Sequence, residues 1–376
     1  MSSLEKPGVA FIGLGAMGMG MATNLLRTFS VTGFDVYEPT LEKFRLAGGQ
    51  TATTPRSAVA NAQKDVELVD APVSGGTARA ALGTLVVLAS GPEKSLEAAK
   101  PVLNAMAEPL HTIPGGLGAG TKAKMVHQAL AGIHMIMASE AMGFAAFLGL
   151  NTKQAFDYLI TSSGRSWMLA NRVPHMLENN LHPYSALNIL VKDIGIVTAD
   201  GRRVKCPLFL CSAAEQVLVS GVRSGFGLED DSGLVRAYIP TQPSLVFEQT
   251  TAVTAISGHD PRLKLVEDIL AGAIGLDAEM LYDIVKGAAG ASTMFVEKVP
   301  ALLSGKCTSK VTVNNIIARL NLAIEEASQI KYPLHLTATA LQILQLASAR
   351  GFGDEPDVAV AKIWDSQLKF PSPVLS

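Results

Sequence analysis

The sequence predicts an α/β domain built on a parallel sheet, followed by two copies of an all-helical domain. Short β-like runs alternate with helical stretches from Gly8 to about Ile113, which is the rhythm of parallel strands joined by crossover helices. A glycine-rich stretch at 115–120 follows, and nearly everything from there to Pro371 has helical periodicity. The helical part also repeats itself, and a length of 376 residues is typical of two or three domains.

Five apolar runs are expected to form the strands of the first domain: Val9–Ile12, Val31–Val36, Val66–Pro72, Thr84–Ser90 and Leu110–Ile113. Only 30 residues separate Asp35 from Val66. A six-strand doubly wound sheet needs about two further strand–helix units there, each of roughly 25 residues. We therefore expect a shortened domain in which central strands are absent and the edges of neighbouring strands are exposed.

The helical part contains an internal repeat with an offset of 126 residues. Leu150–Asp231 matches Leu276–Asp357 without a gap, and glycine and proline positions stay in register. The matched pairs include Gly164/Gly290, Pro174/Pro300, Pro207/Pro333, Gly225/Gly351 and Asp231/Asp357. Coincidence between two Ala/Leu-rich segments would give apolar matches, but it would not give matched glycine and proline positions over the whole segment. We infer a tandem duplication and expect domains at 1–121, 122–242 and 243–376.

Composition excludes several classes of protein. The 31 basic and 33 acidic residues nearly balance, so nucleic acid is not an expected partner. Of the three cysteines, Cys206 and Cys211 flank Pro207 in an apolar run, which is typical of reduced core thiols and not of a disulfide scaffold or metal site. The N-terminus lacks the pattern of a secretory signal, and the apolar stretch Met125–Leu150 carries polar residues that favour a buried helix over a membrane span. We expect a cytoplasmic protein.

A glycine-rich turn predicts a dinucleotide site. It follows the strand Val9–Ile12, opens the helical run Met19–Arg27 and comprises Gly13, Leu14, Gly15, Ala16, Met17 and Gly18. Such glycines let backbone amides approach a diphosphate at a helix N-terminus. Asp35 lies 20 residues beyond Gly15, the separation expected for a carboxylate that accepts from the ribose hydroxyls. Val36 and Tyr37 offer no cation for a 2′-phosphate, so NAD is expected over NADP. A purely structural turn is the alternative.

A second turn follows the predicted strand at Val66–Pro72. Ser74, Gly75 and Gly76 would expose a hydroxyl and backbone amides, which suits a small carboxylate. A plain turn explains the same residues equally well.

Charged residues in the first helical copy are candidates for catalysis. Lys124 begins the long helical stretch, with His127 and Gln128 on the same face. A partly desolvated lysine near a helix N-terminus can act as a general acid/base, although a lone lysine is more often a surface residue, as we expect for Lys122. Lys192 and Asp193 lie in an apolar run. The second copy has Thr250, Ala318 and Arg319 at the positions of Lys124, Lys192 and Asp193, so we expect the chemistry in the first copy.

Four motifs occur in the order found in a known family. They are GLGAMG with MATNL behind it, DAPVSGG, GGLGAGTKAK and the VKD that ends at Asp193. The chain thereby resembles the β-hydroxyacid dehydrogenase family, which includes 3-hydroxyisobutyrate dehydrogenase. The runs Lys124–Gln128, Ser166–Met168 and Gly227–Asp231 are similar to its L-threonate dehydrogenase branch.

The resemblance implies an NAD-binding Rossmann domain, a helical domain and an active site in the cleft between them. It implies Lys124 as general acid/base, His127 as a residue that orients substrate, and Lys192 as a residue near nicotinamide and substrate. Ser74, Gly75 and Gly76 would hold the substrate carboxylate. Relatives pack their helical domains against a partner subunit, so we expect the second copy to dock on the first within the chain. Formation of a homo-oligomer is a further possibility.

The expected function is NAD-dependent oxidation of the hydroxyl of a small hydroxy acid of the 3-hydroxyisobutyrate or L-threonate type. A reductase of small aldehydes or keto acids, running in the opposite direction, is a neighbouring alternative. The shortened first domain favours a second alternative, in which the chain is a catalytically impaired paralogue or splice form that retains the scaffold.

Overall fold

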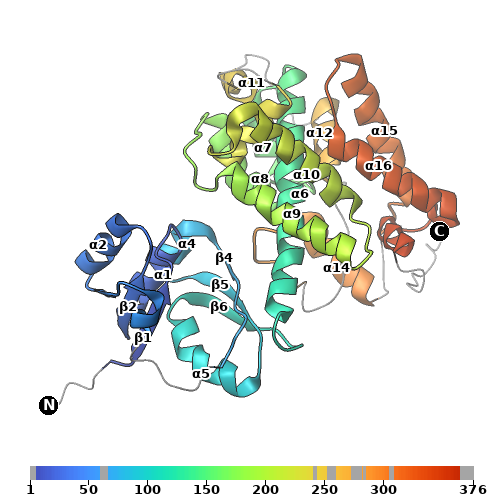
Figure 1. Cartoon of the computed structure of the whole chain (residues 1–376). Coiled ribbons are helices and arrows are strands. Elements are labelled where there is room, and N and C mark those ends of the chain that lie inside the picture. The colour runs from blue at the N-terminus through green and yellow to red at the C-terminus, as the bar shows by residue number, and fades with distance from the viewer. Residues whose placement is uncertain are drawn as a thin grey trace. The chain divides into compact units, whose positions relative to one another are not determined.

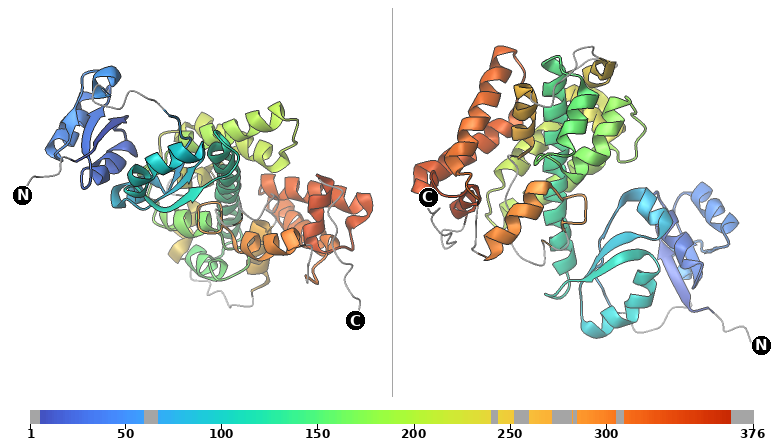
Figure 2. Two further views of the ribbon diagram at one scale, coloured as in Figure 1. Left: turned by 90° about the horizontal axis from the view of Figure 1, so that it is seen from below. Right: turned by 180° about the vertical axis from the view of Figure 1, so that it is seen from behind.

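The computed structural model describes residues 6–59, 67–239, 244–251, 260–271, 282, 285–304 and 309–364. The chain divides into two compact units, Met1–Lys124 and Met125–Ser376. In Figure 1 and Figure 2 the first unit is coloured blue to cyan and carries the strands, whereas the green to red unit is helical. The fold is a Rossmann-like α/β domain with small sheets, followed by helical copies.

The first sheet is parallel and has the order β1-β2-β3. Its strands are β1 (Gly8–Ile12), β2 (Ser30–Phe34) and β3 (Gln50–Thr51), and its helices are α1 (Gly18–Leu25), α2 (Glu38–Leu46) and α3 (Pro55–Ala58). Leu14, Leu25 and Phe44 are fully buried in the core under this sheet. The expected first and second strands are therefore confirmed, with β3 in addition.

The second sheet has the order β4-β5-β6 and is mixed. It contains β4 (Val73–Ser74), β5 (Leu85–Ala89) and β6 (Ala107–Thr112), with the helices α4 (Gly76–Leu82) and α5 (Glu93–Asn104). β4 runs antiparallel to β5, whereas β5 and β6 are parallel. The expectation of a purely parallel sheet is thus wrong at this edge.

The expected strand at Val66–Pro72 is also wrong over the described residues 67–72. Asp70 and Ser90 form an isolated bridge there, and the Leu88 amide donates to the Pro72 carbonyl at 3.0 Å. Because Pro72 has no amide to donate in return, the ladder is interrupted between this bridge and β4. Val66 itself lies outside the described residues.

Between the two sheets, the described residues make contact by helix packing. The Nδ2 of Asn24 on α1 donates to the carbonyl oxygens of Ala80 and Ala81 on α4, at 2.9 Å and 3.0 Å. A Cβ at Gly20 would lie 2.8 Å from the Ala80 carbonyl carbon, so α1 and α4 approach too closely for any side chain at that position. The sequence predicts a shortened domain without central strands, and over the described residues the strands form two separate three-stranded sheets.

The helical unit is built around α6 (Ala119–Phe147). This helix is long and apolar enough to cross a membrane by length and composition, but 94% of its most apolar window is buried inside the protein, which is the expected behaviour of a core helix. The other elements of the first copy are α7 (Thr152–Leu159), α8 (Trp167–Leu177), α9 (Leu187–Arg203), α10 (Phe209–Gly221), η1 (Val222–Phe226) and η2 (Asp231–Ala237).

The second copy repeats most closely the later elements of the first. Its described elements are α11 (Leu245–Glu248), η3 (Gln249–Thr251), α12 (Pro261–Ala271), α14 (Thr293–Ser304), α15 (Val313–Gln329), α16 (His335–Ala347), η4 (Ser348–Phe352) and η5 (Asp357–Ile363). From α15 to η5, each element begins and ends 126 residues after its counterpart. Both copies fall in one compact unit, so the boundary between residues 242 and 243 stays a prediction.

The two copies meet through reciprocal backbone contacts. The Trp167 amide donates to the Ala291 carbonyl at 2.8 Å, and the Thr293 amide donates to the Arg165 carbonyl at 2.8 Å. The two bonds are equivalent under the 126-residue offset. Trp167 corresponds to Thr293, and Arg165 corresponds to Ala291. Such reciprocity is the signature of an isologous, two-fold interface. The second copy therefore docks on the first within the chain, as subunits dock in a symmetric dimer.

A buried carboxylate strengthens this contact. Glu140 on α6 is fully buried and accepts hydrogen bonds from the amides of Leu336 and Thr337, both at 3.0 Å, in the first turn of α16. The Tyr332 hydroxyl donates to the Glu140 carbonyl at 2.9 Å. Residues of both copies form one continuous hydrophobic core around these bonds.

The cysteines differ from each other in burial. Cys211 on α10 is buried, as expected for a core thiol, whereas Cys206 is exposed. Cys206 follows Lys205, whose positive φ of 58° turns the chain outward between α9 and α10, so its expected burial is wrong.

Candidate functional site

The glycine-rich turn is shaped by two different requirements. Gly13 has a φ of +92°, and a Cβ at Gly18 would lie 1.9 Å from the Gly13 carbonyl oxygen, so the chain itself requires both glycines. Gly15 differs, because a Cβ there would meet no protein atom within 4 Å. The amides of Gly15, Ala16 and Met17 find no acceptor within the described chain. This open turn before α1 fits an incoming diphosphate.

Asp35 is fixed against the same turn. Its carboxylate accepts from the Leu14 amide at 2.7 Å and from the Tyr37 amide at 2.9 Å. The hydrogen bond from Tyr37, followed by that from Leu14, holds the pKa of Asp35 below its usual value. An ionised carboxylate has further lone pairs, so Asp35 can still accept from ribose hydroxyls. Val36 is 93% exposed and Tyr37 64% exposed, so neither position after Asp35 offers a positive charge.

The second turn follows β4, and its serine, whose hydroxyl was expected to be exposed, is a buried residue. Gly75 and Gly76 have φ values of +136° and +66°, in the region that favours glycine. A Cβ at Gly76 would meet no atom within 4 Å, whereas one at Gly75 would meet the Arg79 side chain. Ser74 is buried at the end of β4. The turn thus leaves space beside the backbone at Gly76, which is compatible with binding of a carboxylate group.

Asp70 and Ser90 anchor the first turn of α6, a role that the sequence did not reveal. Asp70 accepts from the Thr121 amide at 2.8 Å and from its hydroxyl at 2.7 Å, and the Gly120 amide donates to the Ser90 hydroxyl at 2.9 Å. Lys124 lies one turn further along, partly buried, while Lys122 is exposed as expected. The position of Lys124 is therefore set by polar contacts within the first unit. In the sequence, the only sign of this anchoring role is the acidic first residue of DAPVSGG, which is Asp70.

Polar residues of α6 and α9 form a chain in the second unit. His127 is 2% exposed, and its Nδ1 lies 2.9 Å from Gln128 Oε1. The Nε2 of Gln128 donates to the Asp193 carboxylate, which pairs with the Lys192 ammonium at 2.7 Å. Lys192 is 64% exposed, so its head group is accessible while Asp193 holds it. The structure thus brings His127 and Lys192 together through residues that link them.

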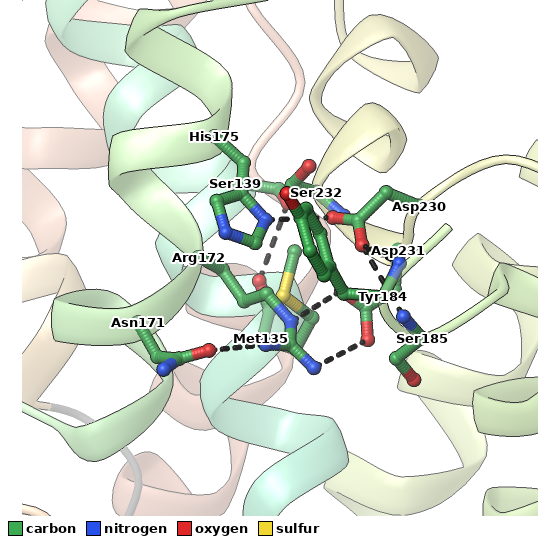
Figure 3. A network of polar contacts seen from close by, with 10 residues as sticks. All are labelled: Met135, Ser139, Asn171, Arg172, His175, Tyr184, Ser185, Asp230, Asp231 and Ser232. Atoms are coloured by element: carbon green, nitrogen blue, oxygen red, sulfur yellow. Dashed lines mark hydrogen bonds and ion pairs between the residues drawn. The ribbon is translucent and has the colours of Figure 1, made fainter. Parts of the chain in front are cut away.

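A second polar network in this unit is architectural. Arg172 pairs with the buried Asp231 at 2.6 Å, and His175 lies 3.1 Å from the buried Asp230 (Figure 3). Asp230 also accepts from the Tyr184 amide at 3.1 Å. Burial raises the pKa of Asp231, opposed by the charge of Arg172. These contacts fasten the segment after α10 to α8.

Comparison with known proteins identifies the family. A model described as the NAD-binding region of NADP-dependent 3-hydroxyisobutyrate dehydrogenase matches residues 118–238 and again 267–364. The NAD-binding domain of 6-phosphogluconate dehydrogenase matches 8–65 and 53–116. The chain belongs to the β-hydroxyacid dehydrogenase family. Members of this family are NAD-dependent oxidoreductases that act on hydroxyl groups, and the open glycine turn with Asp35 fits the adenosine diphosphate half of NAD.

Individual relatives agree with this assignment. The chain is 34% identical to L-threonate dehydrogenase of Cupriavidus necator over 283 residues, covering 61% of this chain and 95% of the relative. It is 27% identical over 293 residues to the mitochondrial 3-hydroxyisobutyrate dehydrogenase of Rattus norvegicus, covering 62% and 87%. The crystal structure of 3-hydroxyisobutyrate dehydrogenase from Salmonella typhimurium has a TM-score of 0.56 at 31% identity, covering 61% of this chain and 99% of that one.

The matches also locate the shortening. The Cupriavidus necator alignment runs over 283 residues but includes only 61% of this 376-residue chain, so part of the relative has no counterpart here. The two matched pieces of the NAD-binding domain overlap at residues 53–65, within the interval that the sequence predicts to be short. The repeated match at 118–238 and 267–364 agrees with the tandem helical copies.

Proposed function

We propose that this chain oxidises the hydroxyl of a small hydroxy acid of the 3-hydroxyisobutyrate or L-threonate type with NAD, and that Lys124 is the general acid/base. The observation that carries the proposal is the anchoring of α6 by Asp70 and Ser90. It fixes a partly buried lysine in the same compact unit that holds the open glycine turn. Positioning of this kind is what a proton-transfer residue requires.

Each candidate residue has a role in this proposal. The turn comprising Gly13, Leu14, Gly15, Ala16, Met17 and Gly18 binds the diphosphate of NAD, and Asp35 accepts from the ribose. Ser74, Gly75 and Gly76 bind the substrate carboxylate through a hydroxyl and amides. NAD, when bound, supplies the hydride acceptor. Lys124 takes the proton from the reacting hydroxyl and returns it to water after product leaves.

Lys192 and His127 complete the proposed site. The accessible ammonium of Lys192, steadied by Asp193, interacts with nicotinamide and substrate. His127, which is buried on α6, is the residue that we propose helps to orient the substrate. The exposed Val36 and Tyr37 offer no partner for a 2′-phosphate, which supports NAD over NADP. The relatives named above are enzymes of bacteria and mitochondria, and for this chain we propose a cytoplasmic location and a small-molecule substrate.

The test is replacement of the lysine. We expect Lys124→Ala to lower turnover of L-threonate and 3-hydroxyisobutyrate by about 100-fold or more, because general acid/base catalysis contributes roughly that much. Binding of NAD, measured by calorimetry, should stay unchanged. Lys122→Ala, at the exposed neighbour on α6, is the matched control and should turn over normally. Undiminished turnover in Lys124→Ala would refute the assigned role.

A scaffold without activity is the second candidate function. Its support is specific: the α/β unit contains two separate three-stranded sheets and lacks part of the relatives' sequence. Calorimetric titration of the wild-type chain separates the two functions. Absence of binding at millimolar NAD would favour the scaffold, and saturable binding would favour the enzyme.

A further inference from the structure

The second helical copy reaches a proposed site residue of the first. The Gly290 amide donates to Nε2 of His127 at 3.3 Å. His127 therefore has partners at both ring nitrogens, Gly290 from the second copy and Gln128 from its own helix. The ring is buried, so neither partner is replaced by bulk solvent.

The contact is built into the packing of the two copies. A Cβ at Gly290 would lie 3.1 Å from the His127 carbonyl oxygen and 3.2 Å from the Leu130 Cβ. Leu130 packs in a small core with Val285 and Phe295 of the second copy. This core seats the chain around Gly290 directly on α6. A Cβ at this position would therefore force the segment and α6 apart by a few tenths of an ångström.

This hydrogen bond determines the tautomer of His127. A nitrogen that accepts from an amide carries no proton, so the neutral ring bears its proton on Nδ1 and donates to Gln128 Oε1. The amide group of Gln128 is then oriented with Nε2 toward Asp193, whose carboxylate accepts and holds Lys192. The Gly290 amide at one end and the Asp193 carboxylate at the other thus impose the same direction on the hydrogen bonds between them.

We propose that Gly290 is a positioning residue for the site in the first copy: its amide fixes the Nδ1-protonated tautomer of His127 and, through Gln128 and Asp193, the placement of Lys192. The second copy acts as a built-in partner subunit. At the matching positions it carries Val253, Thr254 and Ala318 in place of His127, Gln128 and Lys192, so the assistance runs in one direction. The effect on catalysis rests on the proposed function, whereas the effect on the His127 tautomer does not.

The first measurement uses the unmodified full-length chain. Long-range proton–nitrogen NMR spectra of histidine-labelled protein report the protonation of each ring nitrogen, and loss of a signal set in His127→Gln assigns His127. We expect a neutral ring with its proton on Nδ1. A His127 ring protonated on Nε2 overturns the inference without any need for a folded interface variant.

The second measurement compares two glycines in the same segment. Gly290→Ala places a Cβ against α6 and should move His127 toward the Nε2-protonated form. Because small displacements of positioned groups are costly, kcat for L-threonate or 3-hydroxyisobutyrate should fall roughly tenfold with KM for NAD unchanged. Gly287→Ala is the control, since a Cβ there meets no atom within 4 Å. Indistinguishable behaviour of the two variants in the NMR spectra overturns the inference.

Failure of the proposed function gives a different result. If the wild-type chain oxidises neither hydroxy acid but His127 shows the expected tautomer, and only Gly290→Ala alters it, the positioning contact is supported and the dehydrogenase proposal is refuted.

Discussion

The two helical copies share a scaffold and differ in chemistry. Gly225 and Gly351 have φ values of +94° and +92°, and Lys205 and Lys331 have φ values of +58° and +61° at matching positions. The second copy has nevertheless replaced Lys124 by Thr250. Backbone conformation is retained in both copies because packing depends on it. The comparison therefore separates positions kept for structure from the position that we propose for proton transfer.

The interface between the copies shows the same division. Its backbone bonds are reciprocal, but Glu140 caps α16 whereas the equivalent residue in the second copy is Val266. In a duplicated chain, the two halves of the interface are encoded by separate stretches of sequence. A substitution can therefore change one half and leave the other as it was. In a homodimer, any substitution would change both halves at once.

The largest expected effect tests whether the shared scaffold is equally important in both copies. Arg172 pairs with Asp231, and Lys298 pairs with Asp357 at 3.0 Å at the matching position. We expect Arg172→Met and Lys298→Met each to lower the free energy of unfolding by about 3–5 kcal/mol, because a buried carboxylate loses its partner. Urea unfolding measures both. A large loss in one copy and none in the other would break the structural equivalence.

A somewhat smaller effect is expected at the asymmetric part of the interface. Glu140→Gln replaces one acceptor oxygen by a donor facing the first turn of α16, where Leu336 and Thr337 also donate. We expect a loss of about 3 kcal/mol in the free energy of unfolding. Glu325→Gln, at an exposed position on α15, should change it by less than about 0.5 kcal/mol. Equal effects of the two variants would show that Glu140 does not fasten the copies together.

The smallest effect appears only in acid. Burial lowers the pKa of His134 on α6 to about 4, and its Nδ1 has no hydrogen-bond partner among the residues that the structure describes. A base with a depressed pKa stabilises the fold above its unfolded pKa near 6.5, and this stability is lost as pH falls toward 4. The loss amounts to about 3 kcal/mol at most.

Replacement of His134 tests this assignment. The free energy of unfolding is measured by urea unfolding at each pH. In His134→Leu, the decrease between pH 6.5 and 4 that we assign to His134 should disappear. At pH 7.5 the free energy of unfolding should stay within about 1.5 kcal/mol of the unsubstituted chain. His182→Gln, at an exposed histidine, should leave the pH dependence as it is. A slope that survives in His134→Leu would assign the titration to other groups.

Much of the fold could be predicted from the sequence. The glycine turn and Asp35 are predicted as a nucleotide site because such a site imposes fixed spacings on a strand, a turn and a helix, and their role stays a prediction. The repeat was found because glycine and proline mark turns whose register a duplication preserves. The mixed sheet was missed, since Val73 and Ser74 form a strand of two residues, too short to have a period. Cys206 was misplaced because apolar neighbours do not reveal a positive φ at the preceding residue.

The sequence by itself determined the dinucleotide turn, the shortened α/β domain, the duplication and the family. These follow from local backbone conformation and hydrophobic period, which nearby residues dictate. Only the tertiary structure decided that Asp70 anchors α6, that Glu140 caps α16 and that Gly290 reaches His127. Each of these contacts joins residues far apart in the chain, and their partners are selected by the packing of apolar surfaces, which many different pairs of helices could satisfy.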